Sequence, residues 1–270
     1  MLRHSDFQPG LVQDAITLSR EISMNRRIAP SALFIAILAS GSAFTNSAHA
    51  GAAEVVYQPI VENGETEIEI RNGWRTFDGG REEHASILEL GRGVNDHWFT
   101  ELEIEQSFEN GGPNKIEAFE WENIFALTER GKYWADFGLF AAYEHTFSKD
   151  PDGLKIGPMF MKDIGPVTAN VNLLFEREVG NGASHDTGLG YTWQVRWHGN
   201  EAFEFGAQGF GELGALGHLG QDQSHIAGPA IFGSKRFGRD TVKWNAAVLG
   251  GLDRNAPNVT VRTQIEIEMH

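Results

Sequence analysis

The chain has 270 residues and is strongly acidic, with 37 Asp and Glu residues against 22 Lys and Arg residues and a formal net charge of −15. This balance argues against nucleic-acid binding, because contacts with phosphates need clustered basic side chains. The sequence holds 32 Gly and no Cys, which excludes disulfides, thiolate metal sites and cysteine nucleophiles.

The first 50 residues contain an export signal. Residues 24–27 form a short basic opening, and residues 28–39 are mostly apolar. Small residues follow, up to Ala48 and Ala50, which have the spacing of a cleavage site. This order predicts a secretory signal peptide over residues 24–50. The apolar stretch is too short to span a membrane comfortably as an anchor.

Three further segments complete the predicted organisation. Residues 1–23 precede the signal peptide and are interpreted as an over-extended or non-native start. Residues 51–65 follow the cleavage site and are expected to form a periplasmic N-terminal segment. Residues 66–270 are expected to form a single β-domain.

Residues 66–270 alternate apolar and polar side chains with a period of two, which predicts strands with two different faces. No window has a 3.6-residue period over the length of a helix, so the chain is predicted to be all-β. The stretch 97–109 is the clearest example. One parity holds Trp98, Thr100, Leu102, Ile104, Gln106 and Phe108, and the other holds Glu101, Glu103, Glu105 and Glu109.

Clusters of Gly, Pro, Asn and Asp divide this region into about twelve strands, with ten as the fallback count. An even number is typical of antiparallel up-and-down transmembrane barrels. Pro158 and Pro229 fall inside predicted strands and mark either bulges or an error in the count. The expected strands are 66–75, 84–91, 97–109, 115–127, 132–147, 153–162, 166–179, 187–198, 201–212, 224–234, 241–251 and 258–270.

The connections between these strands fall into two sets, one for each end of the barrel. The set expected to be extracellular is longer on average and includes both of the longest connections, 76–83 and 213–223, as in outer-membrane barrels. The other members of this set are 110–114, 148–152, 180–186 and 252–257.

A soluble sandwich or lipocalin-like barrel also alternates, but the polar face favours a membrane barrel. That face carries mainly carboxylates, whereas the solvated face of a soluble sheet is expected to mix both signs. Large aromatic side chains of the apolar face lie at two levels near the turns, with an apolar band between them, as in two membrane girdles. The predicted girdle residues are Trp74, Trp98, Phe108, Tyr133, Phe147, Tyr191, Trp197, Phe203 and Trp244.

Several short stretches resemble a known group of proteins. They are the turn and strand Gly91-Arg92-Gly93-Val94-Asn95-Asp96-His97-Trp98, then Leu154-Lys155-Ile156-Gly157-Pro158, Ile164-Gly165-Pro166 and residues 172–180. Together they are similar to poorly characterised, transporter-like β-barrels of the proteobacterial outer membrane, including those of phenol-degradation pathways. The resemblance implies contact with outer-membrane lipids and with the barrel assembly machinery. The chain departs from such barrels at its end, Ile267-Glu268-Met269-His270, where an outward aromatic residue is usual.

The inward parity is rich in carboxylates and poor in basic residues. Such a wall concentrates cations and repels anions, and twelve strands leave only a narrow path. The sequence therefore predicts a channel for passive passage of small cationic or neutral polar solutes, with no cofactor. The expected constriction residues are Glu101, Glu103, Glu105, Glu120 and Glu122 facing Arg196 and Arg262.

Two other functions stay open. A lipid-processing hydrolase would use Ser184-His185-Asp186, although neighbours in a strand point to opposite faces. An occluded structural or adhesive barrel would act through its loops alone. The acidic and histidine groups at 82–84 and 218–225 lack regular ligand spacing, so no metal site is predicted.

Overall fold

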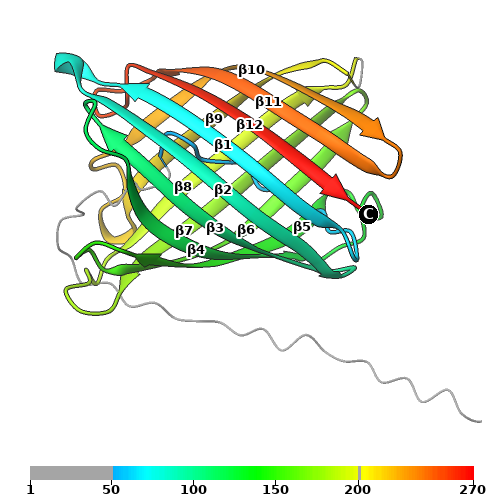
Figure 1. Ribbon diagram of the computed structural model, residues 1–270, viewed down its shortest axis with the longest axis horizontal. Coiled ribbons are helices and arrows are strands. Elements are labelled where there is room, and N and C mark those ends of the chain that lie inside the picture. The colour runs from blue at the N-terminus through cyan, green and yellow to red at the C-terminus, as the bar shows by residue number, and fades with distance from the viewer. Residues whose placement is uncertain (1–50, 200–201) are drawn as a thin grey trace, which may run out of the picture. The chain divides into compact units, whose positions relative to one another are not determined.

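The computed structural model describes residues 51–199 and 202–270. In this part of the chain, twelve antiparallel strands form a closed barrel (Figure 1). The strands are β1 (Thr66–Thr76), β2 (Glu82–Asn95), β3 (Trp98–Glu109), β4 (Lys115–Ala126), β5 (Asp136–Thr146), β6 (Asp152–Ile164), β7 (Val167–Val179), β8 (Thr187–Trp197), β9 (Glu204–Ala215), β10 (Ser224–Phe237), β11 (Asp240–Gly251) and β12 (Val259–Met269). Two short 3-10 turns, η1 (Asp78–Gly80) and η2 (Leu216–His218), lie in connections.

Residues 1–23, the predicted signal peptide 24–50 and its cleavage residues Ala48 and Ala50 lie outside the described residues. In the part that is described, no helix has the length and apolar character needed to cross a membrane.

The barrel is closed by pairing its first strand with its last. Each strand pairs with its neighbours in sequence, and β1 pairs with β12 from Thr66↔Met269 to Thr76↔Val259. Figure 1 shows the cyan β1 beside the red β12. Closure removes the unpaired edges of an open sheet. The predicted up-and-down barrel of twelve strands is confirmed, and the fallback count of ten is wrong.

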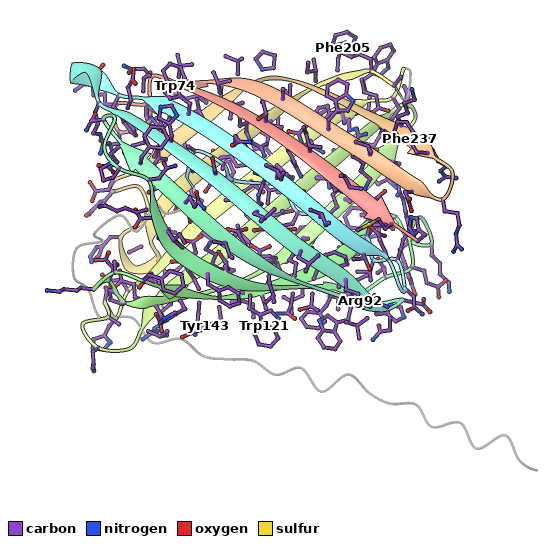
Figure 2. All side chains as sticks on the ribbon, in the orientation of Figure 1. Trp74, Arg92, Trp121, Tyr143, Phe205 and Phe237 are labelled. Atoms are coloured by element: carbon purple, nitrogen blue, oxygen red, sulfur yellow. The ribbon has the colours of Figure 1, made fainter. Side chains whose placement is uncertain are left out.

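The period of two sorts side chains between the inside and the outside of the barrel. In β3, Glu101, Glu103 and Glu105 are buried, whereas Leu102 and Ile104 are 46% and 42% exposed. Figure 2 shows outward side chains such as Trp121, Tyr143 and Phe205 pointing away from the barrel. Other exposed apolar residues are Ile68, Ile70, Leu88, Leu90, Val171, Val195, Val248, Ile265 and Ile267. Water-soluble proteins rarely expose so broad an apolar surface, so this outer face suits lipid chains.

Two polar side chains on the outward parity are satisfied by tryptophans. Trp98 Nε1 donates a hydrogen bond to Asn123 Oδ1 at 3.0 Å, and Trp121 Nε1 donates to Thr100 Oγ1 at 2.8 Å. A polar group facing lipid is costly when it has no partner. The indoles therefore allow these polar residues on an apolar surface.

Pro158 and Pro229 interrupt the strand pairing without shifting it. The register of β6 with β7, and of β10 with β11, is the same on both sides of each proline. The prediction that these prolines mark bulges is therefore wrong. The register shifts lie instead between Gly93 and Asn95, between Glu105 and Gln106, and between Gly188 and Gly190.

The predicted lengths of the connections are also partly wrong. The sequence predicts a strand over 132–147, but β5 begins at Asp136, so Tyr133 and Trp134 precede it. These two rings are 58% and 73% exposed in the connection between β4 and β5. This is the longest connection among the described residues, and it belongs to the set expected to be short. Alternation shows which residues suit a strand, but it does not show where pairing stops.

The glycine before Pro158 permits a close approach of two backbones. A Cβ at Gly157 would lie 1.7 Å from the Leu173 carbonyl oxygen of β7. We expect Gly157→Ala to destabilise the barrel by about 3 kcal/mol, because the new methyl group would force the strands apart. Gly250→Ala in β11 is the matched control, since no atom lies within 4 Å of a Cβ there. Urea unfolding in lipid vesicles measures both variants, and equal stability would contradict the close approach.

Candidate functional site

Three adjacent strands place carboxylates side by side on the inner wall. The register pairs Glu101 with Glu122 and Glu103 with Glu120 across β3 and β4, and it pairs Glu103 with Glu89 of β2. The structure thus brings together the five glutamates predicted at the constriction, and Glu89 joins them. We call this set of six the acidic wall: Glu89, Glu101, Glu103, Glu105, Glu120 and Glu122, each at most 5% exposed.

Two basic side chains face the acidic wall. Arg71 of β1 lies 3.1 Å from Glu89 and also forms an ion pair with Glu103. Lys155 of β6 lies 3.1 Å from Glu120. Both residues have the inward parity. The sequence alone does not show which basic residue reaches which carboxylate, because the partners are 18 to 35 positions apart along the chain.

 Counted along the chain, Arg71 is 18 positions from Glu89 and 32 from Glu103, and Lys155 is 35 from Glu120.

The two arginines expected to face the five glutamates have other partners. Arg196 of β8 forms an ion pair with Glu204 of β9. Arg262 of β12 donates a hydrogen bond to Gln208 Oε1 at 2.6 Å. Arg71 and Lys155 therefore contact the acidic wall in the place that the sequence pattern gave to Arg196 and Arg262. The part that all these residues play in selectivity stays a prediction.

The acidic wall carries more negative charge than its basic neighbours offset. Six carboxylates face Arg71 and Lys155, and all six are nearly excluded from solvent. Buried carboxylates are costly without a counter-charge or a proton. The carboxylates that Arg71 and Lys155 do not offset therefore need a proton or another cation.

Residues 51–65 run along the inside of the barrel. The Ala52 carbonyl oxygen passes Gly73 of β1 so closely that a Cβ on Gly73 would lie 1.9 Å from it. At the other end of the barrel, the Gly64 N–H donates to the Gly93 carbonyl oxygen of β2 at 2.9 Å. The sequence pattern predicts a periplasmic segment here and gives no sign of these contacts. Inward glycines such as Gly73 and Gly93 were the available signal, because they leave room for a second chain segment.

Tyr57 anchors this segment, which we call the lumenal segment, to β4, β5 and β7. Its hydroxyl donates to Glu122 Oε1 at 2.7 Å, and its backbone carbonyl accepts from Asn172 Nδ2 at 3.2 Å. Its ring stacks on Phe140 with the ring centroids 4.0 Å apart. The preceding residue, Val56, packs into an inward apolar cluster. The other members of that cluster are Phe210, Ile226, Ala230, Phe232, Ala247, Leu249 and Ala256.

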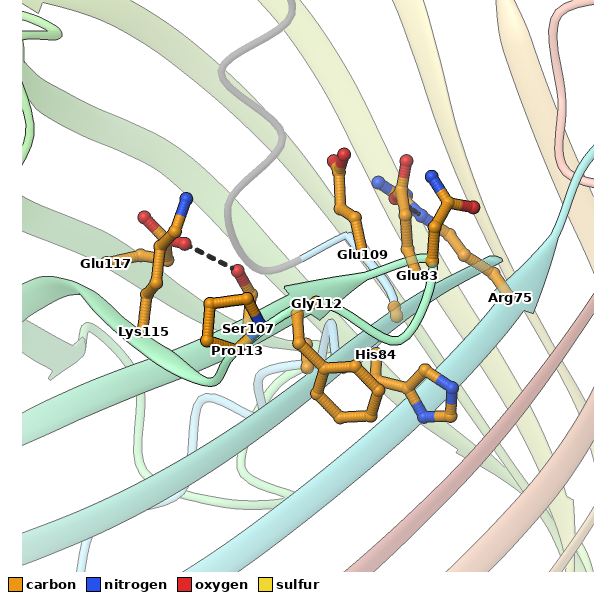
Figure 3. Close-up of a pocket in the computed structure, with 13 residues that line it drawn as sticks. Arg75, Glu83, His84, Ser107, Glu109, Gly112, Pro113, Lys115 and Glu117 are labelled. Carbon is orange, nitrogen blue, oxygen red and sulfur yellow. Dashed lines mark hydrogen bonds and ion pairs between the residues drawn. The ribbon is translucent and has the colours of Figure 1, made fainter. Parts of the chain in front are cut away.

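Two cavities lie beside the lumenal segment. The larger, of about 490 Å³, lies at the end of the barrel where β1 joins β2 and β3 joins β4. Its charged lining includes Arg75, Glu83, Glu109, Lys115 and Glu117 (Figure 3). The smaller, of about 40 Å³, lies between the lumenal segment and the acidic wall and has room for only a few water molecules. At that level the lumen is narrow while the segment is in place.

The nine predicted girdle aromatics lie at both ends of the barrel. Near one end, the His84 ring lies between Trp74 and Phe108, with centroids 6.2 and 4.1 Å away. Near the other end, Phe203 contacts Trp244 with centroids 5.8 Å apart. Their contact with a membrane interface stays a prediction. Tyr133, Phe147, Trp197 and Phe203 are exposed, and Trp74, Trp98, Phe108, Tyr191 and Trp244 are half-buried.

Ser184 and Asp186, two of the residues in the hydrolase hypothesis, form local hydrogen bonds in the connection between β7 and β8. The Ser184 hydroxyl accepts a hydrogen bond from the Asp186 N–H at 3.1 Å, and the Ser184 N–H donates to Glu178 at 2.7 Å. His185 is exposed. These contacts shape the connection between β7 and β8 and do not align a nucleophile with a base.

Comparison with solved structures supports the fold. The NanC porin has a TM-score of 0.52 and 12% identity, with 75% of this chain and 99% of that chain covered. An outer-membrane channel from Pseudomonas putida F1 has a TM-score of 0.53 and 12% identity, with 77% of this chain and 97% of that chain covered. At this identity the likeness extends to the fold alone. No family model and no curated protein matches the sequence.

Tyr57→Phe tests how firmly the lumenal segment is held. The substitution keeps the ring on Phe140 and removes the hydroxyl that donates to Glu122. We expect the segment to detach at least about tenfold more often, because losing a hydrogen bond to a buried charged group costs about 1.5–3 kcal/mol. The chain has no Cys, so maleimide labelling of Val56→Cys reports detachment, with and without Tyr57→Phe. Equal labelling rates would show that the hydroxyl does not hold the segment.

Proposed function

We propose that this protein is an outer-membrane channel for small solutes that prefers cations and neutral polar molecules to anions. The observation that carries the proposal is the acidic wall, in which six buried carboxylates face Arg71 and Lys155 inside a closed barrel. Passage would be passive, because the barrel offers a path whose wall charge sets the preference without any coupled reaction.

The outer surface supports a place in the outer membrane. Its broad apolar face suits lipid chains, and the two barrels to which the fold is similar are described as a porin and an outer-membrane channel. Partners in this proposal are outer-membrane lipids and the barrel assembly machinery. The proposed solutes include small neutral polar molecules, and the resemblance to transporter-like barrels of phenol-degradation pathways is part of this proposal.

The charge selectivity of the open channel tests this proposal. In planar bilayers with a KCl gradient, we expect the reversal potential to show about tenfold preference for K⁺ over Cl⁻. Glu120→Gln combined with Glu122→Gln should remove most of this preference, because two carboxylates of the acidic wall are neutralised. Asp96→Asn combined with Asp240→Asn is the control, since both side chains are exposed at the barrel ends. Anion selectivity of the unchanged protein would reject the proposal.

The lumenal segment supports a second candidate, an occluded structural barrel, because it leaves a cavity of only about 40 Å³ beside the acidic wall. If the protein is a channel, the segment limits its conductance. We therefore expect deletion of residues 51–61 to raise single-channel conductance severalfold, because the lumen gains the space of an extended chain.

A matched variant replaces residues 51–61 with Gly and Ser at the same length, which keeps the chain and removes Tyr57 and Val56. This variant should also conduct more than the unchanged protein. If neither variant forms channels in the bilayer, the occluded barrel is the better description.

A further inference from the structure

We propose that Arg262 binds the carboxylate group of a small zwitterionic solute, which carries an ammonium group at its other end. The inference rests on the proposed channel and names the class of neutral polar solute that it takes. It concerns the lumen once the lumenal segment has moved away from Arg262.

The guanidinium group of Arg262 has two N–H groups without a partner. Arg262 has the inward parity of β12 and is 2% exposed. Its Nη1 donates a hydrogen bond to Gln208 Oε1 at 2.6 Å. Its Nε and Nη2 make no hydrogen bond, and Arg262 has no ion pair among the described residues. Because a buried charge without a counter-charge is costly, this guanidinium needs an anionic ligand that the chain itself does not supply.

The two free N–H groups have the geometry that a carboxylate requires. Nε and Nη2 form one edge of the planar guanidinium, and their hydrogens point in the same direction, so together they bind both oxygens of one carboxylate. The rest of the group is held in place. Gln208 accepts from Nη1, and the Phe210 ring centroid lies 5.1 Å from the guanidinium carbon of Arg262. The free edge is therefore oriented before a solute arrives.

The lumenal segment runs past Arg262 without pairing with it. Gly73 of β1 is the register partner of Arg262, and the Ala52 carbonyl oxygen lies where a Cβ on Gly73 would meet it. Val56 packs in the same cluster as Phe210, whose ring contacts Arg262. At these two points the segment offers only apolar side chains. A carboxylate that binds the free edge of Arg262 would therefore compete with the segment for this part of the lumen.

The charge of the rest of the lumen selects a zwitterion rather than a simple anion. The carboxylates of the acidic wall outnumber Arg71 and Lys155, which face them. Glu54 of the lumenal segment lines the small cavity beside this wall and adds to its negative charge. A simple anion would add further negative charge to the lumen. A zwitterion brings a carboxylate to Arg262 and an ammonium group to the acidic side, and it leaves the net charge unchanged.

Maleimide labelling of Val56→Cys in the full chain, folded in lipid vesicles, tests the inference. Val56 is 5% exposed and the chain has no Cys, so labelling reports departure of the segment. The probes at pH 7 are 4-aminobutyrate, which carries both charged groups, and butyrate and butylamine, which carry one each. We expect 4-aminobutyrate to raise the labelling rate severalfold and saturably, and the other two to have little effect.

Variants made in the Val56→Cys chain assign the effect to Arg262. Arg262→Gln should abolish the rise, whereas Arg262→Lys, which keeps the charge and loses the paired N–H groups, should need at least about tenfold more 4-aminobutyrate. Lys243→Gln is the control, because Lys243 is an inward basic residue of β11 that already pairs with Glu266 at 2.8 Å. It should respond to 4-aminobutyrate as the unchanged residue does.

Three results would overturn the inference: no rise with 4-aminobutyrate, an equal rise with butyrate or butylamine, or an undiminished rise in both Arg262 variants. Folding of each variant is checked by its heat-dependent mobility on gels, and Arg262→Lys decides the matter if Arg262→Gln does not fold. A cation-selective channel whose labelling ignores 4-aminobutyrate would end this inference alone. A barrel that responds to 4-aminobutyrate through Arg262 but never conducts would end the proposed function alone.

Discussion

Pairing of β1 with β12 is the constraint on which the rest of the structure depends. Closure gives every strand two neighbours and gives the sheet one enclosed face and one outer face. A period of two then places half of the side chains inside, regardless of their charge. The acidic wall is a consequence, because Glu101, Glu103 and Glu105 share a parity whose only available space is the lumen. The same constraint places Leu102 and Ile104 on the outer face, where these apolar side chains are more stable against lipid than in water.

The fold was largely predictable from the sequence because alternation is a local property. The parity of β3 and β4 gave the strands, the barrel and the inward position of Glu120 and Glu122, and the structure agrees. Boundaries were harder to predict, since Tyr133 and Trp134 suit a strand equally well but lie in a connection. The end of a strand depends on the length of its partner, which local pattern does not contain.

The candidate site was only half predictable, for a similar reason. Parity identifies which carboxylates point inward, but the partner of each depends on contacts across the barrel. Arg71 meets Glu89 and Glu103 on two successive strands, whereas Arg262 extends to Gln208 on β9. The lumenal segment has no alternation and so carried no signal of its own. Its contacts with inward glycines and with Glu122, Phe140 and Asn172, which only the three-dimensional structure shows, place it inside.

The lumenal segment also explains how one barrel can be well packed and still serve as a channel. Its contacts include a hydroxyl on Glu122, a backbone carbonyl on Asn172, the Tyr57 ring on Phe140, the burial of Val56 and a backbone hydrogen bond from Gly64 to Gly93. Interactions of these kinds contribute about 1–3 kcal/mol each, whereas the barrel is held by continuous ladders between all neighbouring strands. The proposed channel therefore requires the segment to leave the lumen while the ladders of the wall stay paired. Release would expose the acidic wall to solutes, and the cost of leaving Glu122 without its donor would favour return of the segment.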